Sequence, residues 1–417
     1  MTNIYIQTQG CSLNHSDSEV MAGILKKSKF NIVDKPEQSD LIIFNSCIVK
    51  RPTEIAFYKQ LEEFQKLKKP IIIAGCIPQV KPKKLRDFSL IGVDQINSIV
   101  EVVEETLNNN IVKLLARENN KRLNLPKIRK NKIIEIIPIC KGCLGECAYC
   151  TVKNARGKLI SYKSDEILEQ ALAAVNQGAK ELWITAQDTG AYGKDIETNL
   201  PKLITKLTKI PGNFKIRVGM MNPNHALTYL DELIEVYKNE KVFKFLHLPV
   251  QSGNNDILKL MKRKYTVEEF KQIIKKVREQ IPDITIATDI ICGFPTETEE
   301  QFKDSIRLIE EINPNVINIS RFWPRPFTEA EKMEQIHPKE TKERSRALTT
   351  AFEWTAFKNN KKWIGWEGEV IIDEIGKDNT WVGRNFAYRP IIIKGDYNLG
   401  DKVKVKVKEV TIHDLRA

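Results

Sequence analysis

Three cysteines lie close together in the middle of the chain: Cys143, Cys147 and Cys150. Thiolates are the usual ligands of iron–sulfur clusters. Three of them on one short loop can hold three irons of a cubane [4Fe-4S] cluster and leave the fourth iron open to a small molecule that carries an amine and a carboxylate. The spacing therefore predicts a cluster with one iron available for chemistry.

A zinc site with Cys140 as the fourth ligand is the alternative interpretation of this loop. Structural zinc sites usually take their ligands from two separated pairs of residues. A single crowded loop therefore favours the iron–sulfur cluster, and Cys140 keeps the zinc interpretation open.

A second set of three cysteines lies in the first quarter of the chain, at Cys11, Cys47 and Cys76. Each follows an apolar run that is typical of a β-strand, at residues 3–6, 41–44 and 71–74. The segments between these runs look helical, which predicts parallel strands that all end at one edge of a sheet. We therefore expect the three thiols to converge on a second cluster. A buried structural cysteine is the alternative for any one of them alone.

Length and composition suit a multidomain enzyme. The chain has 417 residues, of which 41% are hydrophobic, so two or three domains are expected. No apolar stretch approaches the roughly 20 residues that a membrane span needs, and the first residues lack a signal-peptide pattern, so we expect a cytoplasmic protein with no membrane partner. Cytosolic thiols are kept reduced, which favours metal ligation over disulfides. Glycine-rich phosphate loops and serine–histidine nucleophile patterns are missing, which gives NTPase and hydrolase functions no support.

Positive charge is concentrated around the loop that carries Cys143, Cys147 and Cys150. The net charge is +12, and residues 113–163 hold thirteen Lys and Arg against three Glu. A solvated surface is the usual interpretation of such a run. Its position beside the presumed reactive loop favours contacts with phosphate groups, so we expect an RNA partner and no DNA partner.

The middle of the chain predicts a parallel, barrel-like α/β domain. Six strand-like runs alternate there with helical stretches, at residues 133–137, 182–185, 215–220, 243–248, 284–288 and 316–320. In such barrels the chemistry gathers where strands end, and the cysteine loop follows the first run. Hydrogen bonding within the barrel is the alternative for the polar residues at these places. The residues that we expect to contact a cofactor are Tyr149, Gln187, Asp188, Arg217, His247, Gln251, Ser252 and Asp289.

The last 60 residues change to short alternating strands, at 366–372, 380–384 and 403–408. The strict Val/Lys alternation of the last run places valines on one face and lysines on the other. A small β-barrel that binds RNA is expected, and a purely structural barrel is the alternative. The residues that we expect to contact RNA are Lys127, Arg129, Lys130, Arg156, Arg384, Tyr388, Lys404 and Lys406.

These motifs together resemble the radical S-adenosylmethionine methylthiotransferases over essentially the whole chain. The first cluster loop matches the signature of the radical S-adenosylmethionine superfamily, and residues 9–14 (QGCSLN), 45–47 (NSC) and 74–76 (AGC) match the amino-terminal methylthiotransferase domain. Residues 150–158, 187–193 and 322–326 are most similar to the archaeal and eukaryotic group that modifies threonylcarbamoyladenosine in tRNA. The resemblance implies a domain at 1–110, a basic linker at 111–129, a partial (βα)6 radical core at 130–356 and a TRAM domain at 357–417.

The resemblance also implies a reaction. A methylthio group would be attached to C2 of the adenine at tRNA position 37, in an anticodon stem-loop that carries threonylcarbamoyladenosine. The cluster on the middle trio would deliver one electron, from a reductant such as flavodoxin or ferredoxin, and cleave S-adenosylmethionine to methionine and a 5′-deoxyadenosyl radical. The second cluster would hold the sulfur that is methylated and transferred.

Three positions depart from the family pattern: Phe327 replaces a common glycine, Arg321 a common amide and Cys140 a common asparagine. The alternatives within the same chemistry are isopentenyladenosine in tRNA and an aspartate of a ribosomal protein. A non-catalytic metal-containing RNA-binding protein is the alternative from another class.

Overall fold

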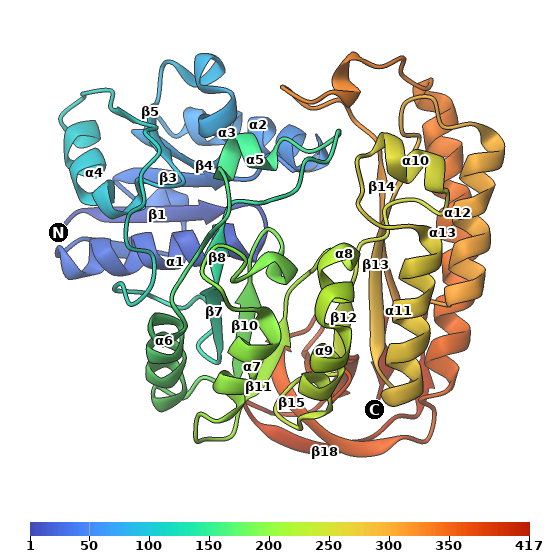
Figure 1. Cartoon of the computed structure of the whole chain (residues 1–417). Helices are drawn as coiled ribbons and strands as arrows, with labels where there is room; N and C mark the ends of the chain where they lie inside the picture. Colours follow the sequence, from blue (N-terminus) through green and yellow to red (C-terminus); the bar gives the residue numbers. More distant parts are fainter. Residues whose placement is uncertain (50) are drawn as a thin grey trace.

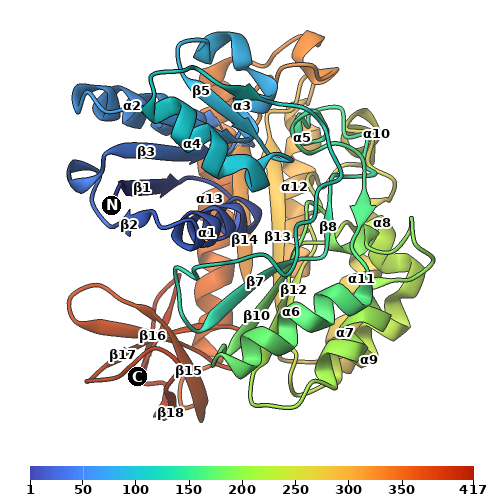
Figure 2. The ribbon, with the colours of Figure 1, turned by 90° about the vertical axis from the view of Figure 1, so that its left-hand side faces the viewer.

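The computed structural model describes residues 1–49 and 51–417 and contains three packed units. Figure 1 shows the amino-terminal α/β unit above the first strands of the central half-barrel, with the carboxy-terminal sheet at the lower end. Figure 2 shows that this last sheet lies below the amino-terminal unit, on the same side of the barrel. In the described part of the chain no helix is long and apolar enough to cross a membrane.

The amino-terminal unit is built on a fully parallel six-stranded sheet. Its strands in spatial order are β2 (Asn31–Val33), β1 (Asn3–Thr8), β3 (Leu41–Ser46), β4 (Ile71–Gly75), β5 (Ser89–Gly92) and β6 (Lys113–Leu114). The three runs that the sequence predicts as strands are therefore adjacent central strands. Strand β6 carries the sheet past residue 110.

Helices cover both faces of this sheet because its central strands are apolar on both sides. On β3, Ile43 packs toward α1 (Ser12–Lys27) and α4 (Ile99–Leu107), whereas Phe44 packs toward α2 (Arg51–Lys66) and α3 (Cys76–Val80). Three short 3₁₀ turns complete the unit: η1 (Pro36–Gln38), η2 (Pro82–Leu85) and η3 (Ile96–Ser98).

The central unit is a half-barrel of six parallel strands, as the sequence predicts. It consists of two three-stranded ladders joined by a parallel bridge between Ile216 and Val242. The first ladder contains β7 (Ile134–Pro138), β10 (Glu181–Thr185) and β11 (Lys215–Val218). The second contains β12 (Phe245–His247), β13 (Thr285–Cys292) and β14 (Val316–Arg321). The short strands β8 (Cys140–Lys141) and β9 (Ile160–Ser161) pair beside it. Its helical segments are α5 (Val152–Arg156), α6 (Ser164–Asn176), η4 (Thr189–Ala191), α7 (Leu200–Thr208), α8 (Pro223–Ala226), η5 (Leu227–Tyr229), α9 (Leu230–Lys238), α10 (Asn255–Leu260), α11 (Val267–Gln280), α12 (Glu299–Ile312), η6 (Ala330–Lys332) and α13 (Pro338–Lys361).

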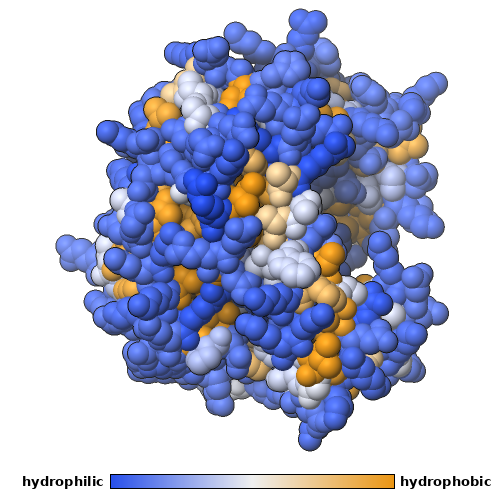
Figure 3. Space-filling model, turned by 90° about the vertical axis from the view of Figure 1, so that its right-hand side faces the viewer, coloured by the Kyte–Doolittle hydropathy of each residue, from blue (hydrophilic) through white to orange (hydrophobic). Residues whose placement is uncertain are grey.

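The outer helices bury one apolar face each against the strands. Capping boxes begin α11 at Thr266 and Glu269 and α12 at Thr298 and Gln301, which fixes where both helices start. Seen from the side of these helices, the surface is predominantly hydrophilic with short apolar stretches (Figure 3). These helices therefore pack their apolar faces on the strands and present a mostly polar surface.

The carboxy-terminal unit is a curled six-stranded sheet. Its strands in spatial order are β18 (Lys402–Lys406), β15 (Glu367–Ile375), β16 (Thr380–Arg384), β17 (Pro390–Lys394), β20 (Leu415–Arg416) and β19 (Glu409–Val410). On β18, Val405 is buried in the core of the sheet, whereas Lys404 and Lys406 are exposed. The alternation that the sequence predicts is therefore present, with the lysines facing outward.

A buried polar cluster joins this sheet to the half-barrel. The Arg217 guanidinium carbon lies 4.9 Å from the ring centroid of Trp183 and 5.1 Å from that of Tyr388. Trp183 Nε1 donates to Glu181 Oε2 at 2.8 Å, and Arg384 pairs with Asp373 at 2.9 Å. The carboxy-terminal sheet is thus fixed to the barrel by charged groups that have little access to water.

The stability of this junction should depend on pH. Burial, with the neighbouring Asp373 carboxylate, raises the pKa of Glu181 to about 8. A carboxyl whose pKa is higher in the folded than in the unfolded state holds more protons when folded, so stability is lost as pH rises from the ordinary value of 4.5 to the folded value of about 8. We expect the unfolding temperature to fall between about pH 5 and about pH 8, and to fall less in Glu181→Gln; an equal fall in both proteins, measured by calorimetry, would contradict this assignment.

The basic segment between the first two units is engaged in interdomain ion pairs. Lys127 of this segment pairs with Glu19 at 3.1 Å and with Glu135 at 2.7 Å, and Lys141 of β8 pairs with Asp94 at 2.9 Å. The acidic partners Glu19 and Asp94 belong to the amino-terminal unit. Much of the charge that the sequence assigns to phosphate contacts therefore holds the two units together.

Asp17 forms a second buried cluster of charges between the units. Its carboxylate lies 3.2 Å from Arg122 and 2.9 Å from Arg156, and all three side chains are less than a tenth exposed. Asp17→Asn leaves two buried guanidinium groups without their counter-ion, and we expect it to cost about 3–5 kcal/mol of stability. Glu367→Gln breaks the exposed pair with Lys406 and should not shift the unfolding midpoint in urea. Equal midpoints for both variants would contradict the role of Asp17.

Candidate functional site

The loop that carries Cys143, Cys147 and Cys150 lies between β8 and α5. Gly142 begins it with a φ of +70°, and a Cβ there would overlap the carbonyl group of Lys158. At Gly145 the backbone N–H donates to Cys143 Sγ at 3.2 Å. The loop therefore turns tightly, and the Cys143 sulfur lies against the backbone of the same loop.

The thiols of this loop are half-buried, and burial dominates their acidity. It raises the pKa of Cys143 to about 11 and that of Cys150 to about 12. Coordination to iron deprotonates such thiols, so a bound cluster supplies the compensation that burial requires. Arg263 Nη1 donates to Cys147 Sγ at 3.1 Å, which provides positive charge for a thiolate. The donor set therefore fits an iron–sulfur cluster.

The second trio occupies equivalent strand ends, as predicted. Cys11 caps α1 after β1, Cys47 follows β3 directly, and Cys76 begins α3 after β4. Glycine precedes two of them for steric reasons: a Cβ on Gly10 would lie 2.7 Å from the Cβ of Cys47, and one on Gly75 would overlap Asn45. The close approach of these loops therefore brings the three cysteines to one edge of the sheet.

A buried amide network holds this edge. Asn14 Nδ2 donates to Asn45 Oδ1 at 3.1 Å and to the carbonyl of Ser46 at 3.0 Å, and Asn45 Nδ2 donates back to the carbonyl of Asn14 at 2.8 Å. When protonated, the Cys11 thiol donates to Asn14 Oδ1 at 3.3 Å. Donation from the Cys47 thiol lowers the pKa of Cys11 to about 6, so an anionic sulfur is favoured at this edge.

Neither trio is arranged for a single ion. Within residues 1–49 and 51–417, no three His, Cys, Asp or Glu side chains are grouped closely enough to ligate one metal ion. A cubane binds each thiolate through a different iron, so its ligands are spread more widely. The Cys140 thiol is buried in the barrel core, 4.0 Å from the carbonyl of Asp188, so packing accounts for it.

Both trios lie at the same interface between the amino-terminal unit and the half-barrel. Helix α5, which follows the loop of Cys150, packs against α3, which begins with Cys76. A cavity of about 330 Å³ is lined by Val49, two residues after Cys47, and by Tyr149, next to Cys150. Residues beside each cysteine set therefore line one cavity at this interface.

Two polar groups at the strand ends contain most of the residues predicted to contact a cofactor, whereas Tyr149 lines the cavity. Asp188 accepts from Gly190 N and from Asn222 N, both at 3.0 Å, and Asn222 in turn accepts from Arg263. This chain of contacts connects Asp188 with the Cys147 sulfur.

The second group lies on the neighbouring strands. His247 Nε2 lies 3.1 Å from Asp289 Oδ1, which also accepts from Asn318 Nδ2 at 2.6 Å. Gln251, with a φ of +73°, bridges β13 through its backbone, and Ser252 Oγ accepts from Asn254 N. Gln187 Oε1 is buried without a hydrogen-bond partner in the described part of the chain. Contact of these residues with a cofactor stays a prediction.

Arg217 has a different environment from the other candidates. Its guanidinium lies among aromatic rings at the junction with the carboxy-terminal sheet. Several residues predicted to contact RNA are likewise engaged within the protein, since Lys127, Arg129, Arg156 and Arg384 form buried or half-buried ion pairs and Tyr388 is 8% exposed. Lys130, Lys404 and Lys406 are exposed, so the prediction of RNA contacts depends mainly on them.

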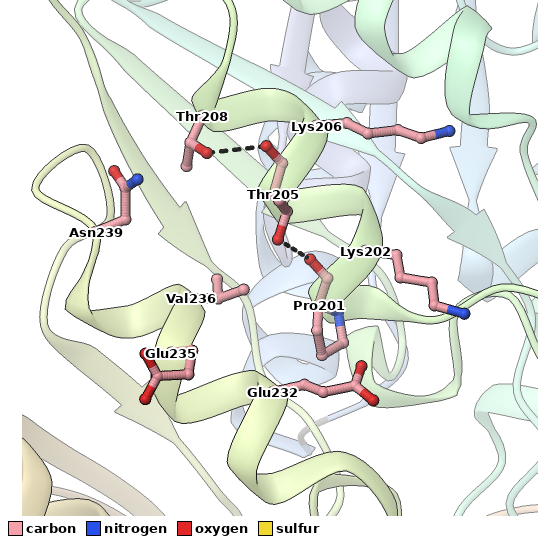
Figure 4. Close-up of a pocket in the computed structure, with 9 residues that line it drawn as sticks. All are labelled: Pro201, Lys202, Thr205, Lys206, Thr208, Glu232, Glu235, Val236 and Asn239. Carbon is pink, nitrogen blue, oxygen red and sulfur yellow. Dashed lines mark hydrogen bonds between the residues drawn. The ribbon is translucent and has the colours of Figure 1, made fainter.

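Sequence reasoning missed Asn222 and Arg263. Neither belongs to a recognisable spacing, and Arg263 lies 116 positions after the cysteine that it contacts. The signal that was available is weak: Asn222 follows the end of a predicted strand, and Arg263 lies only after the next helix, α10. A larger groove of about 650 Å³ between α7 and α9 contains none of the predicted residues (Figure 4).

A parallel half-barrel whose first strand leads into a three-cysteine loop defines a radical S-adenosylmethionine enzyme. The chain matches the radical SAM superfamily over residues 137–309, the family described as uncharacterized protein family UPF0004 over residues 3–94, and the TRAM domain over residues 361–417. A solved structure with this fold is the radical S-adenosylmethionine methyltransferase TsrM from Kitasatospora setae with cobalamin and a [4Fe-4S] cluster bound (TM-score 0.59, 12% identity, 79% of this chain and 77% of that one).

Curated relatives narrow the assignment. The chain is 43% identical to a probable threonylcarbamoyladenosine tRNA methylthiotransferase of Pyrococcus horikoshii, over 95% of this chain and 96% of the relative. It is 42% identical to the Xenopus laevis enzyme (99% and 76%) and 41% identical to the human enzyme (99% and 73%). The chain belongs to the threonylcarbamoyladenosine tRNA methylthiotransferase family.

Proposed function

We propose that this protein attaches a methylthio group to C2 of N6-threonylcarbamoyladenosine at position 37 of tRNA. The observation that carries the proposal is that both cysteine trios lie at one interface, where helices α3 and α5 pack together and residues beside each trio line one cavity, in a chain of this family. An aromatic C2–H is neither acidic nor open to ordinary displacement, so the reaction requires a radical route. The isopentenyl and ribosomal-protein alternatives are disfavoured by the names of the relatives.

Two [4Fe-4S] clusters are part of the proposal. Cys143, Cys147 and Cys150 would hold one, and Cys11, Cys47 and Cys76 the other. When bound, the first cluster with S-adenosylmethionine supplies an organic radical able to remove hydrogen from an unactivated carbon. Arg263 would balance the charge of the Cys147 thiolate, and Asp188 with Asn222 would orient Arg263. The enclosing walls of the cavity would keep water from the reacting groups.

Other residues are assigned to binding. The His247, Asp289 and Asn318 group and the free amide oxygen of Gln187 are the best candidates for S-adenosylmethionine contacts. Lys130, Lys404 and Lys406 would contact tRNA phosphates. The electron donor would be a flavodoxin or ferredoxin, and the protein would act in the cytoplasm. The unit boundaries would lie near residues 110, 130 and 357.

Mass spectrometry of tRNA nucleosides tests the proposal. A strain that lacks this protein should lose the methylthio derivative of threonylcarbamoyladenosine and retain threonylcarbamoyladenosine itself. Re-expression of the wild-type chain should restore the derivative, and the Cys47→Ala chain should not. Loss of methylthio-isopentenyladenosine, or of a methylthio group on a ribosomal protein, with the threonylcarbamoyl derivative unchanged, would overturn it.

A further inference from the structure

The cavity lined by Val49 and Tyr149, which lie beside Cys47 and Cys150, has a basic wall. One side comes from the amino-terminal unit just after Cys47, and the other comes from the ends of β13 and β14 and the segment after β14. Its volume is about 330 Å³, which suits a small organic group. The lining includes Arg51, Tyr149, Ile291, Ile319, Arg321, Trp323 and Arg325.

Two of its arginines share one aromatic ring. The guanidinium carbon of Arg51 lies 4.4 Å from the Trp323 ring centroid, and that of Arg321 lies 5.2 Å from it. Cation–π contacts of this kind hold a guanidinium in place while leaving its N–H groups in plane for hydrogen bonds. Trp323 therefore orients two cationic side chains that come from different units of the protein.

The charge of these two arginines is not balanced within the described part of the chain. Neither Arg51 nor Arg321 has a carboxylate within 4.0 Å there. The third arginine of the cavity differs, since Arg325 pairs with Glu54 at 2.8 Å and donates to the Val49 carbonyl at 2.9 Å. The cavity therefore combines apolar walls with two oriented, unneutralised guanidinium groups, an arrangement that selects a small anion, above all a carboxylate.

We infer that Arg51 and Arg321 bind the carboxylate of the threonylcarbamoyl group. The inference depends on the proposed function, because that function supplies the substrate. Threonylcarbamoyladenosine carries a carboxylate on the side chain of its base, whereas adenosine and isopentenyladenosine have no charge there. Guanidinium N–H groups would donate to the carboxylate oxygens, and the adenine would lie between the two cysteine sets. The two arginines would thus determine specificity, with Trp323 as their positioning residue.

Binding of stem-loop RNAs tests this assignment without requiring turnover. Two RNAs that differ only in threonylcarbamoyladenosine or adenosine at position 37 are titrated against full-length, cluster-loaded protein by fluorescence anisotropy. The wild-type protein should prefer the modified RNA. Arg51→Met and Arg321→Met, which remove both the charge and the N–H donors, should each weaken binding of the modified RNA roughly tenfold or more and leave binding of the adenosine RNA unchanged. Lys206→Gln, which removes a charge from the distant groove of Figure 4, should preserve the preference.

Other sources of an anion give different results. If the arginines contact tRNA phosphates, both RNAs lose affinity equally, and the inference fails. If they contact the carboxylate of S-adenosylmethionine, the variants raise its dissociation constant while the RNA preference survives, and the inference fails as well. Arg321→Lys should recover part of the preference, which loss of folding would not permit.

Failure of the proposed function can be recognised separately. A wild-type protein that shows no preference and forms no methylthio product on the modified RNA refutes the function itself. A wild-type protein that forms the product while both methionine variants retain the full preference refutes only the anion subsite.

Discussion

Replacement of Cys147 by alanine should abolish the formation of 5′-deoxyadenosine. Cys147 lies between the other two cysteines of its loop and is the one whose sulfur accepts from Arg263, so its loss removes one of three ligands from a cluster that has no spare protein ligand. The assay incubates reduced, anaerobic protein with S-adenosylmethionine and quantifies deoxyadenosine by mass spectrometry. The variant should show only the background of a protein-free reaction.

Cys140→Ala is the matched control. Cys140 is buried in the barrel core beside the same loop, and the zinc interpretation makes it the fourth ligand. The cluster interpretation expects Cys140→Ala to keep cleaving S-adenosylmethionine. Wild-type deoxyadenosine formation by Cys147→Ala, or its loss in a folded Cys140→Ala, would refute the assignment of this loop.

Replacement of Cys47 by alanine should separate the two halves of the reaction. Cys47 belongs to the other trio, at the end of β3, and contributes nothing to the loop of Cys147. Cys47→Ala should therefore still form deoxyadenosine, and its methylthio product on tRNA should fall below detection because the sulfur carrier is incomplete. Both quantities are measured in one reaction, so the same protein sample supplies the positive and the negative result.

Two outcomes would contradict this division of roles. Methylthio product from Cys47→Ala would show that the second trio is not needed for sulfur transfer. Loss of deoxyadenosine formation in a folded Cys47→Ala protein would show that the two trios do not act as separate sites.

The positions of the cysteines could be predicted from the sequence because local pattern and topology agree there. The apolar runs before Cys11, Cys47 and Cys76 are strands, and parallel pairing places their ends at one edge. The Val/Lys alternation near Val405 likewise predicts which side chains of that strand are buried. Periodicity predicts which face of an element is buried, and parallel pairing predicts where the strand ends meet.

The role of the basic residues could not be predicted in this way. A run of lysines and arginines shows charge but not its partner, and Asp17, Glu19 and Asp94 lie far away in the sequence. Arg217 was misleading for a similar reason: its strand position is that of a barrel residue, yet the aromatic groups around it include Tyr388 of the last unit. Docking between units decides these cases, and sequence periodicity carries no information about it.

The central claim is that six cysteines hold two separate clusters, and quantification of iron and sulfide tests it most directly. Anaerobically reconstituted wild-type protein should contain about eight irons per chain. A variant in which all three cysteines of one trio are replaced by alanine should contain about four. The Mössbauer spectra of both proteins should be of the [4Fe-4S] type. Loss of all the iron when one trio is removed, or zinc in place of iron, would contradict the account.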